Sequence, residues 1–449
     1  MAISQSLAIL LLVLCLPGTT LAFLSPNNHQ HASSARVTTS PSIVRHGLEA
    51  TSYNDNDNDN NNNSVLDRRA AMERAGGVAL SSLLLSSGIV ATNPGMAYAD
   101  ANFDDGKKKR ILITGSNSGI GLDAAQRMAL RGHEIVLACR TLEKANAAID
   151  KIETNIANDS EDAVDANTLL KSLKLTPMEC DLADLSSIDE FFKSLPNQSF
   201  DAVCYNAGLA RNTGATDVAR TKQGFELTVG TNHLGHFYLN HLLLRSSLVD
   251  KEGGRIVVTA SSVHDPDSPG GAQGETATLG DLKGLERAAA DGSGRFDMVD
   301  GAEFNADKAY KDSKLCNVLF ARELQRRLDA EEGCNIKANC FTPGLIVGTG
   351  LFRDQNQVFT KVFDVAATKL LKVGETTHYG GGALEYVALS TEVEGKGGLY
   401  YYSSPGSSKY GEDAYGKQFH PSEVSKEALE SDGGKGKRFW ELSEKLVGI

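Results

Sequence analysis

A glycine-rich turn between an apolar strand and a helix constrains the fold of this chain more than any other feature. The segment 107–115 reads KKKRILITG and predicts a short buried strand that ends at a glycine. GSNSGIG follows over 115–121, then a stretch with helical periodicity over 122–132 and a second apolar strand over 133–140. A strand, a glycine-rich turn, a helix and a strand in this order form a βαβ unit.

The glycines of this turn have the spacing that a dinucleotide-binding turn needs. The first permits a tight turn, and the next two let the backbone and the helix approach a pyrophosphate at the helix N-terminus. The strand before the pattern and the helix after it are the context that supports this interpretation. The expected cofactor contacts in the turn are Gly115, Ser116, Gly119, Ile120 and Gly121.

The end of the second strand distinguishes between the two nicotinamide cofactors. An acidic residue there bonds the ribose 2′-hydroxyl of NAD, whereas an arginine accommodates the 2′-phosphate of NADP. This chain has Arg140 at that point and no acid before Glu143. We therefore expect NADPH as the cofactor, with a solvated arginine as the alternative interpretation of Arg140.

Five further apolar stretches alternate with helical ones along the chain. They lie at 172–184, 200–208, 255–262, 335–344 and 398–402. This alternation predicts an α/β fold, a Rossmann-like doubly wound parallel sheet with helices on both faces, in a single domain. Ligands of such sheets bind outside the carboxyl ends of the strands, and the motifs described here all fall at those ends.

A tyrosine and a lysine one helical turn apart mark a candidate catalytic centre. In AYKDSK, residues 309–314, Tyr310 and Lys314 share one helix face. An ammonium group beside a phenol favours the phenolate and so lowers the pKa of the tyrosine. An exposed, charged helix turn has the same pattern, so the pair gains meaning only from the rest of the chain.

Taken in order, these motifs resemble the short-chain dehydrogenase/reductase family over residues 108–402. The resemblance implies that Tyr310 donates a proton, while Lys314 lowers the pKa of the tyrosine and holds the nicotinamide ribose. It also implies that Ser261 bonds the substrate or the tyrosine, and that Asn232 holds a water in the proton path.

Ser262 is the alternative to Ser261 in register, because the two serines are adjacent at the end of the fifth strand. The resemblance further implies an adenine contact from the residue after the third strand, and a cofactor cleft supported by the Asn-Ala-Gly turn after the fourth. A Pro-Gly turn and a threonine follow the sixth strand, and the threonine lies near the nicotinamide carboxamide in the family. These implied residues are Asp181, Asn206, Ala207, Gly208, Pro343, Gly344 and Thr349.

Several stretches are similar to one branch of the family, the light-dependent protochlorophyllide reductases of plastids and cyanobacteria. They lie at 224–237, 279–285, 298–317, 349–353 and 443–448. The resemblance implies reduction of one C=C bond in ring D of a tetrapyrrole, with the hydride from NADPH and the proton from the tyrosine. The bound pigment would absorb the light.

The segment 263–305 is an insertion relative to short members of the family, rich in Gly, Asp and Ala, and we expect a loop over the substrate side of the cleft. His264 and Leu345 are candidate substrate contacts. The branch usually has a cysteine at the position of Leu345 and an alanine at that of Gly208. A dark, NADPH-dependent carbonyl reductase, similar to retinol dehydrogenases and acting on a carotenoid, retinoid or lipid ketone or aldehyde, is therefore the alternative function.

The ends of the chain predict targeting and an extension. Residues 1–22 are typical of a signal peptide. The region 23–99 is predicted as a plastid transit region with a low-complexity linker and a twin-arginine-like segment from Arg68, for which a membrane anchor is the alternative. We expect a plastid protein of the stroma or thylakoid membrane, with the lumen left open. We expect residues 403–449 to form a surface extension, in which Trp440, Leu442 and Leu446 make one apolar helix stripe that docks back on the domain.

The composition limits the partners. The net charge of −12 argues against nucleic acid, which favours a basic face. The seven cysteines form no pattern typical of a metal site, and we expect buried thiols without disulfides. His233 and His236 are interpreted as structural. The expected partner is a tetrapyrrole or another large hydrophobic small molecule, with the oligomeric state left open.

Overall fold

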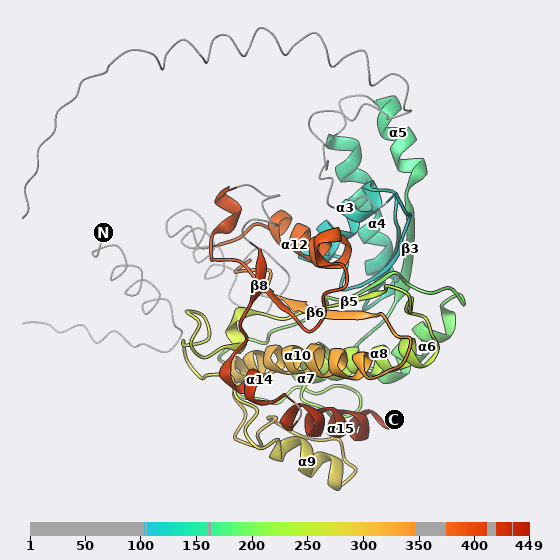
Figure 1. Ribbon diagram of the computed structural model, residues 1–449. Coiled ribbons are helices and arrows are strands. Elements are labelled where there is room, and N and C mark those ends of the chain that lie inside the picture. Colours follow the sequence, from blue (N-terminus) through green and yellow to red (C-terminus); the bar gives the residue numbers. More distant parts are fainter. Residues whose placement is uncertain (1–102, 104–105, 160–162, 347–373, 411–418, 433) are drawn as a thin grey trace, which may run out of the picture. The chain divides into compact units, whose positions relative to one another are not determined.

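Eight strands form one sheet among the residues that the computed structural model describes, which are 103, 106–159, 163–346, 374–410, 419–432 and 434–449 (Figure 1). The order across the sheet is β3-β2-β1-β4-β5-β6-β7-β8. The strands are β1 (Arg110–Thr114), β2 (Glu134–Cys139), β3 (Lys174–Glu179), β4 (Ala202–Tyr205), β5 (Arg255–Thr259), β6 (Lys337–Phe341), β7 (Tyr400–Tyr402) and β8 (His420–Ser422). All neighbours are parallel except β7 and β8. The predicted doubly wound sheet is confirmed, and its chain order reverses between β1 and β4.

Helices cover both faces of the sheet, as Figure 1 shows. One face carries α3 (Gly119–Leu130), α4 (Leu142–Asp159) and α12 (Thr377–Leu389), with α5 (Ala163–Ser172) packed on α4. The other carries α6 (Leu185–Ser194), α7 (Leu227–Val229), α8 (Gly235–Arg245) and α10 (Ala306–Asp329). The short turns are η2 (Gly230–Leu234), η3 (Ser262–His264), η6 (Thr391–Val393) and η7 (Ser407–Tyr410).

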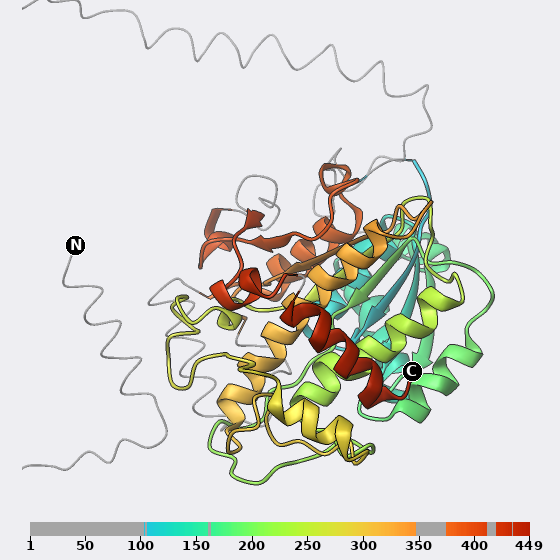
Figure 2. The same cartoon turned by 60° about the horizontal axis from the view of Figure 1, so that its bottom comes forward.

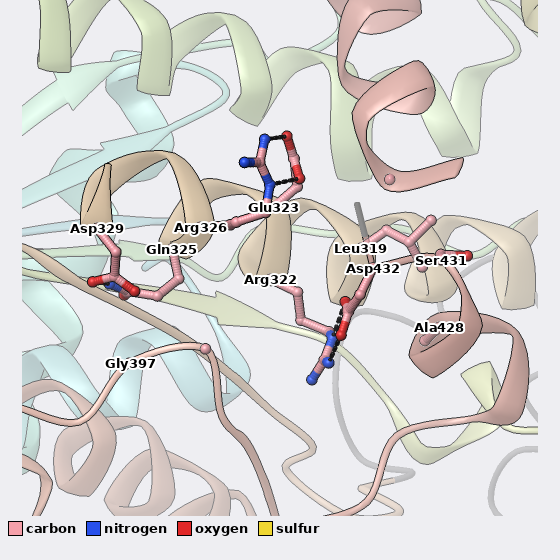
Figure 3. Close-up of a pocket in the computed structure, with 12 residues that line it drawn as sticks. Leu319, Arg322, Glu323, Gln325, Arg326, Asp329, Gly397, Ala428, Ser431 and Asp432 are labelled. Carbon is pink, nitrogen blue, oxygen red and sulfur yellow. Dashed lines mark hydrogen bonds and ion pairs between the residues drawn. The ribbon is translucent and has the colours of Figure 1, made fainter. Parts of the chain in front are cut away.

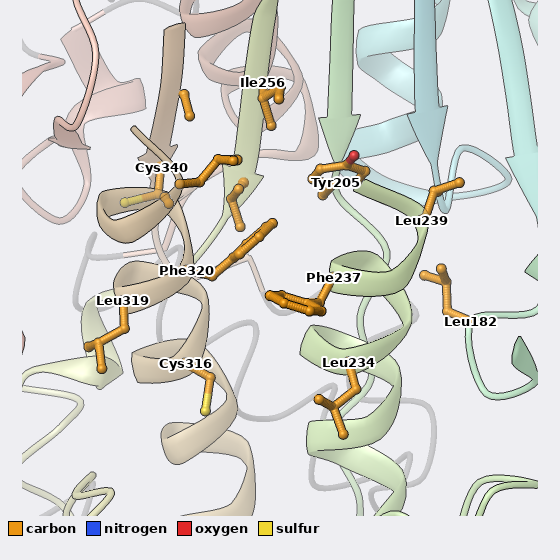
Figure 4. Close-up of a cluster of buried hydrophobic side chains, with 14 of the residues drawn as sticks. Leu182, Tyr205, Leu234, Phe237, Leu239, Ile256, Cys316, Leu319, Phe320 and Cys340 are labelled. Atoms are coloured by element: carbon orange, nitrogen blue, oxygen red, sulfur yellow. The ribbon is translucent and has the colours of Figure 1, made fainter. Parts of the chain in front are cut away.

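The alternation of side chains along each strand builds two cores. Ile111 and Ile113 of β1 point to the face of α3 and α12, while Leu112 between them points to the face of α8 and α10. Both sets are fully buried, as expected for parallel strands covered on each side. Figure 4 shows part of the second core, where Phe237 of α8 packs against Phe320 of α10.

The C-terminal extension does more than cover the surface. Its last helix, α15 (Lys435–Val447), packs against α8, α10 and α9, which spans Lys283–Ala290 (Figure 2). The predicted docking stripe is present: Leu442 is buried, and Trp440 and Leu446 pack against the core. The strand β8 was not expected, because its three exposed residues, one of them Pro421, carry no apolar pattern. A short edge strand tolerates a proline, since it lacks one neighbour.

The insertion 263–305 is not simply a loop over the cleft, so that expectation was wrong in part. It contains α9 (Lys283–Ala290), which packs on α15, and the Leu279 N–H of the insertion donates to Glu427 of α14 (Lys426–Glu430) at 3.0 Å. Leu279, Leu282 and Leu285 are buried in the core on the α10 side. These leucines give the insertion an apolar face of its own. The overall composition of the segment, rich in Gly and Asp, does not show this face.

Some predictions fall on residues that the structure does not describe. They are the targeting regions 1–22 and 23–99, the threonine at 349 and the stretch 349–353. Among the described helices, none combines the length and the apolar character that a membrane crossing requires. The six described cysteines are all free thiols, and five of them are buried.

Replacing Phe320 with alanine tests the core between α8, α10 and α15. The Phe320 ring is buried and contacts Tyr205, Phe237 and Trp440. We expect F320A to lower the free energy of unfolding by about 3–5 kcal/mol, because the lost contacts leave a cavity. Urea unfolding measures this loss. L429A, at a side chain that is 57% exposed, should stay close to the wild type, and equal losses in the two variants would contradict the assignment.

Candidate active site

The glycine-rich turn lies at the carboxyl end of β1, and tight packing explains its glycines. Gly115 and Gly119 have φ of +68° and +59°, which other residues rarely adopt. A Cβ on Gly115 would lie 2.7 Å from the Cα of Ala207, in the turn after β4. The predicted residues of the two turns are therefore brought together, and α3 begins beside them at Gly119, with its first N–H groups open to a phosphate.

The end of β2 places Arg140 beside this turn, and α4 adds Lys151. Arg140 is exposed, as a 2′-phosphate partner needs to be. Lys151 of α4 donates to the carbonyl of Asn117 in the glycine-rich turn at 3.2 Å. Ser116 is buried, with its hydroxyl 3.6 Å from the Cys139 sulfur. Its side chain therefore packs the glycine-rich turn against the end of β2.

Thr114, which the sequence analysis missed, joins the turns after β1 and β4. Its hydroxyl oxygen accepts the backbone N–H groups of Asn206 and Ala207, both at 3.0 Å. The Asn206 side chain donates back to the Thr114 carbonyl at 3.0 Å. Thr259, at the end of β5, donates to the Asn206 side chain at 3.4 Å. A threonine that ends a strand just before a glycine-rich turn was the only local signal for this role.

Tyr310 lies on the first turns of α10, and its phenol has Ser261, which follows β5, as a polar neighbour. The choice of Ser261 over Ser262 as the functional serine stays a prediction. Burial raises the pKa of Tyr310, and the neighbouring Ser261 hydroxyl lowers it by less. The predicted lowering by Lys314 is not found here, because the ammonium lies 5.7 Å from the ring centre and the desolvation of the phenol dominates. The phenol is therefore protonated at neutral pH and able to donate.

Lys314 is buried one helical turn after Tyr310. Its ammonium donates to the Thr259 carbonyl at the end of β5, at 3.1 Å. Asn317, the next residue on this side of α10, donates to the same carbonyl at 3.1 Å. Burial lowers the pKa of Lys314 to about 8, since a charged amine is costly to desolvate.

Asn232 occupies the π-helical turn η2 between α7 and α8, and such turns are frequent at functional sites. Its side-chain oxygen accepts the Leu209 N–H at 2.9 Å. Its amide nitrogen donates to the Leu209 carbonyl and to the Ser313 hydroxyl, both at 3.0 Å. Protein groups thus use both amide hydrogens, so a water in the proton path has to be held by another part of the residue.

The remaining charged residues of AYKDSK fasten the insertion to α10. The Asp312 carboxylate accepts from Lys308 at 2.6 Å and from the Thr278 N–H at 3.0 Å. Lys311 donates to the carbonyls of Gln273 and Glu275, the latter at 2.8 Å. Their role is to hold residues 273–278 beside the helix that carries Tyr310.

The two predicted substrate contacts, His264 and Leu345, differ in their exposure. His264 is buried, its Nδ1 lies 2.7 Å from the Ser261 carbonyl, and its Nε2 accepts the Ser425 N–H at 3.2 Å. Both ring nitrogens are engaged, so the expectation that His264 lines the cleft is not supported. Leu345 is partly exposed after β6, and its carbonyl accepts the Glu375 N–H at 2.8 Å.

The other predicted cofactor residues follow the carboxyl ends of the strands. Asp181 comes directly after Cys180, beyond β3, and its carboxylate accepts the Ala183 N–H at 3.0 Å. Gly344 has φ of +83°, and a Cβ there would lie 2.4 Å from the Glu375 side chain, so the Pro-Gly turn after β6 requires a glycine. Pro343 is partly exposed in the same turn.

A cavity of about 300 Å³ lies away from these residues, between the second half of α10, the Gly397–Gly398 turn and the α14–α15 region (Figure 3). Its arginines are paired: Arg322 with Asp432, and Arg326 with Glu323. None of the predicted site residues lines it. The candidate active site is therefore the group of residues around Tyr310, Lys314 and the glycine-rich turn, at the carboxyl ends of the strands, and not this cavity.

Replacing Gly121 with alanine tests the dinucleotide turn. The added methyl group would lie 2.5 Å from the Asn206 amide nitrogen and 2.6 Å from the Gly115 carbonyl oxygen. We expect the affinity for NADPH, measured by fluorescence titration, to fall about tenfold or more. G253A is the control, because its methyl group meets no atom within 4 Å. Equal affinities of the two variants would disprove the assignment.

The lowered pKa of Lys314 predicts a pH dependence of stability. Between about pH 8 and 10.5 the unfolded chain keeps the proton of this lysine and the folded protein has lost it. The free energy of unfolding should therefore rise with pH across this window, relative to K314M, by up to about 3 kcal/mol. Urea unfolding at a series of pH values, without cofactor, measures the difference. Parallel curves for wild type and K314M would refute the shift.

Comparisons with known proteins agree with this geometry. The family model described as short chain dehydrogenase matches residues 109–273. The chloroplastic protochlorophyllide reductase of Daucus carota is 33% identical over 373 residues, covering 81% of this chain and 85% of the relative. The chloroplastic protochlorophyllide reductase A of Hordeum vulgare is 34% identical over 369 residues, covering 80% and 86%.

A solved structure is similar as well. A crystal structure of an uncharacterized protein from Mycobacterium paratuberculosis has a TM-score of 0.51 and 26% identity, and the match covers 78% of this chain and 97% of that chain. The relatives above 30% identity extend along most of both chains. This protein therefore belongs to the short-chain dehydrogenase family, in the branch of the protochlorophyllide reductases, and is an oxidoreductase.

Proposed function

We propose that this oxidoreductase uses NADPH to reduce a C=C bond of protochlorophyllide in a light-dependent reaction. The observation that carries the proposal is the cluster of Tyr310, Ser261 and Lys314 beside the glycine-rich turn, in a chain whose relatives are named protochlorophyllide reductases. The chloroplastic relatives and the presequence composition support a plastid location.

The residues present fit NADPH. A Cβ on Gly121 would overlap Asn206, so the backbone forms a close-packed cradle at the start of α3. Ser116 and Ile120 lie in this cradle. Exposed Arg140 is suited to the 2′-phosphate, and the buried ammonium of Lys314 to the nicotinamide ribose. When bound, NADPH supplies the hydride.

The protein supplies the proton and the charge for the reaction. The phenol of Tyr310 is protonated at neutral pH and donates its proton to the substrate carbon opposite the one that receives the hydride. The Ser261 hydroxyl, a neighbour of the phenol, donates a hydrogen bond to the phenolate that remains and stabilises it. The positive charge of Lys314 favours the same phenolate once both groups face the substrate.

A flash experiment on the whole chain tests the proposal. We expect protein with NADPH and protochlorophyllide to form product after a light flash and none in darkness. Y310F should still bind both ligands, since the ring remains, but product formation should fall by roughly 10²–10⁴-fold. Pigment fluorescence measures binding, and absorbance measures product. Turnover in darkness, or a failure to bind the pigment, would rule out this function.

The difference at Leu345 favours a second candidate, a dark carbonyl reductase acting on a carotenoid, retinoid or lipid ketone or aldehyde. Leu345 places an apolar side chain where the branch usually has a thiol. The difference at Gly208 adds little, because a Cβ there would lie 3.4 Å from Asn232 and 3.6 Å from Lys314, ordinary contact distances. NADPH-dependent carbonyl reduction in darkness would establish this alternative.

A further inference from the structure

We propose that His236 is a positioning residue that ties Asn232 to the cofactor-binding turn after β4. The inference rests on the proposed function, because it assigns a task within the same site. His236 is buried at the start of α8, one helical turn after Asn232. The mechanism above makes no use of its ring.

On one side, the His236 ring holds the backbone of Asn232. The helix is irregular here, because Gly230–Leu234 forms a π-helical turn. The ring Nδ1 lies 3.0 Å from the Asn232 carbonyl oxygen. A carbonyl oxygen only accepts, so Nδ1 carries the proton of the neutral ring and donates it.

On the other side, the ring holds Thr114. With its proton on Nδ1, the neutral ring has only an acceptor at Nε2. Nε2 lies 2.9 Å from the Thr114 hydroxyl oxygen, so the hydroxyl donates to the ring. The competing acceptor, the Cys204 carbonyl, is farther away at 3.3 Å. The direction of each bond is thus set by the groups themselves.

The Thr114 hydroxyl extends the chain of hydrogen bonds to the cofactor turn. Its oxygen accepts the N–H groups of Asn206 and Ala207, both at 3.0 Å, and its one proton goes to His236. The hydroxyl therefore uses its donor and both acceptor positions. Burial lowers the pKa of His236 to about 4, so the ring stays neutral and the direction of the chain is kept at neutral pH.

Asn232 closes the arrangement from the other end. Its side chain pairs with both backbone groups of Leu209, at 2.9 and 3.0 Å, and donates to Ser313 on α10. The turn 206–209 is thus held by Thr114 at its start and by Asn232 at its end, and His236 connects the two. Displacing the ring would move the turn relative to the helix that carries Tyr310.

Matched variants separate the two contacts. H236N keeps a group near Nδ1 for Asn232, H236Q keeps one near Nε2 for Thr114, and H236L removes both. T114V removes the hydroxyl, and T114S restores it. H233L is the control: His233 is equally buried and nearby in the chain, but its ring stacks on Phe439 and bonds Ser443, away from the site.

We expect kcat to fall about tenfold in H236L and in T114V, less in H236N and H236Q, and to recover in T114S. H233L should lose stability while its kcat stays within about twofold of the wild type. Losses of kcat in H236L no larger than in H233L would overturn the proposal. So would a double variant H236L/T114V whose loss equals the two single losses multiplied, because contacts in one chain are not additive.

Hydrogen–deuterium exchange gives a readout that does not need catalysis. In the protein without NADPH or substrate, the peptide over 203–209 should exchange about tenfold faster in H236L and T114V than in the wild type, and unchanged in H233L. Unchanged exchange in H236L would overturn the proposal. If the wild type failed to reduce protochlorophyllide, the proposed function would fall, while exchange would still decide whether His236 holds the turn.

Discussion

The buried ammonium group of Lys314 is the constraint around which the candidate site is arranged. A buried charge without a partner is costly, and the carboxyl end of β5 supplies one through the Thr259 carbonyl, at 3.1 Å. Asn317 donates to the same carbonyl, so two successive turns of α10 are bonded to the end of one strand. This fixes the helix across the sheet edge and brings Tyr310 to Ser261.

The charged residues between Lys308 and Lys314 of α10 have two kinds of partner. Lys314 faces the strand ends, whereas Lys308, Lys311 and Asp312 hold the inserted segment at the flank of the same helix. Buried ion pairs contribute little net stability, because desolvation offsets their attraction. Their effect here is to place residues 273–278 at a definite position beside Tyr310, so that the insertion becomes part of the site's surroundings.

The residues expected to bind the cofactor and the residue expected to contact the substrate differ in how closely they are packed. The glycine-rich turn and the turn after β4 are packed so closely that a Cβ would collide, which leaves little freedom there. Leu345 is partly exposed after β6, and its carbonyl accepts the Glu375 N–H. Packing therefore fixes the predicted cofactor turns more tightly than the predicted substrate contact at Leu345.

Local sequence determined the seven parallel strands, the glycine-rich turn, the Tyr310–Lys314 pair and the docking stripe of α15, because periodicity and backbone conformation depend on neighbouring residues. Only the tertiary structure decided that Thr114 and His236 join the site, that His264 is buried, and that the insertion has its own apolar face. Those outcomes depend on contacts between residues far apart in the chain. A hydrogen-bond partner that arrives from another strand or helix leaves no pattern in the local sequence.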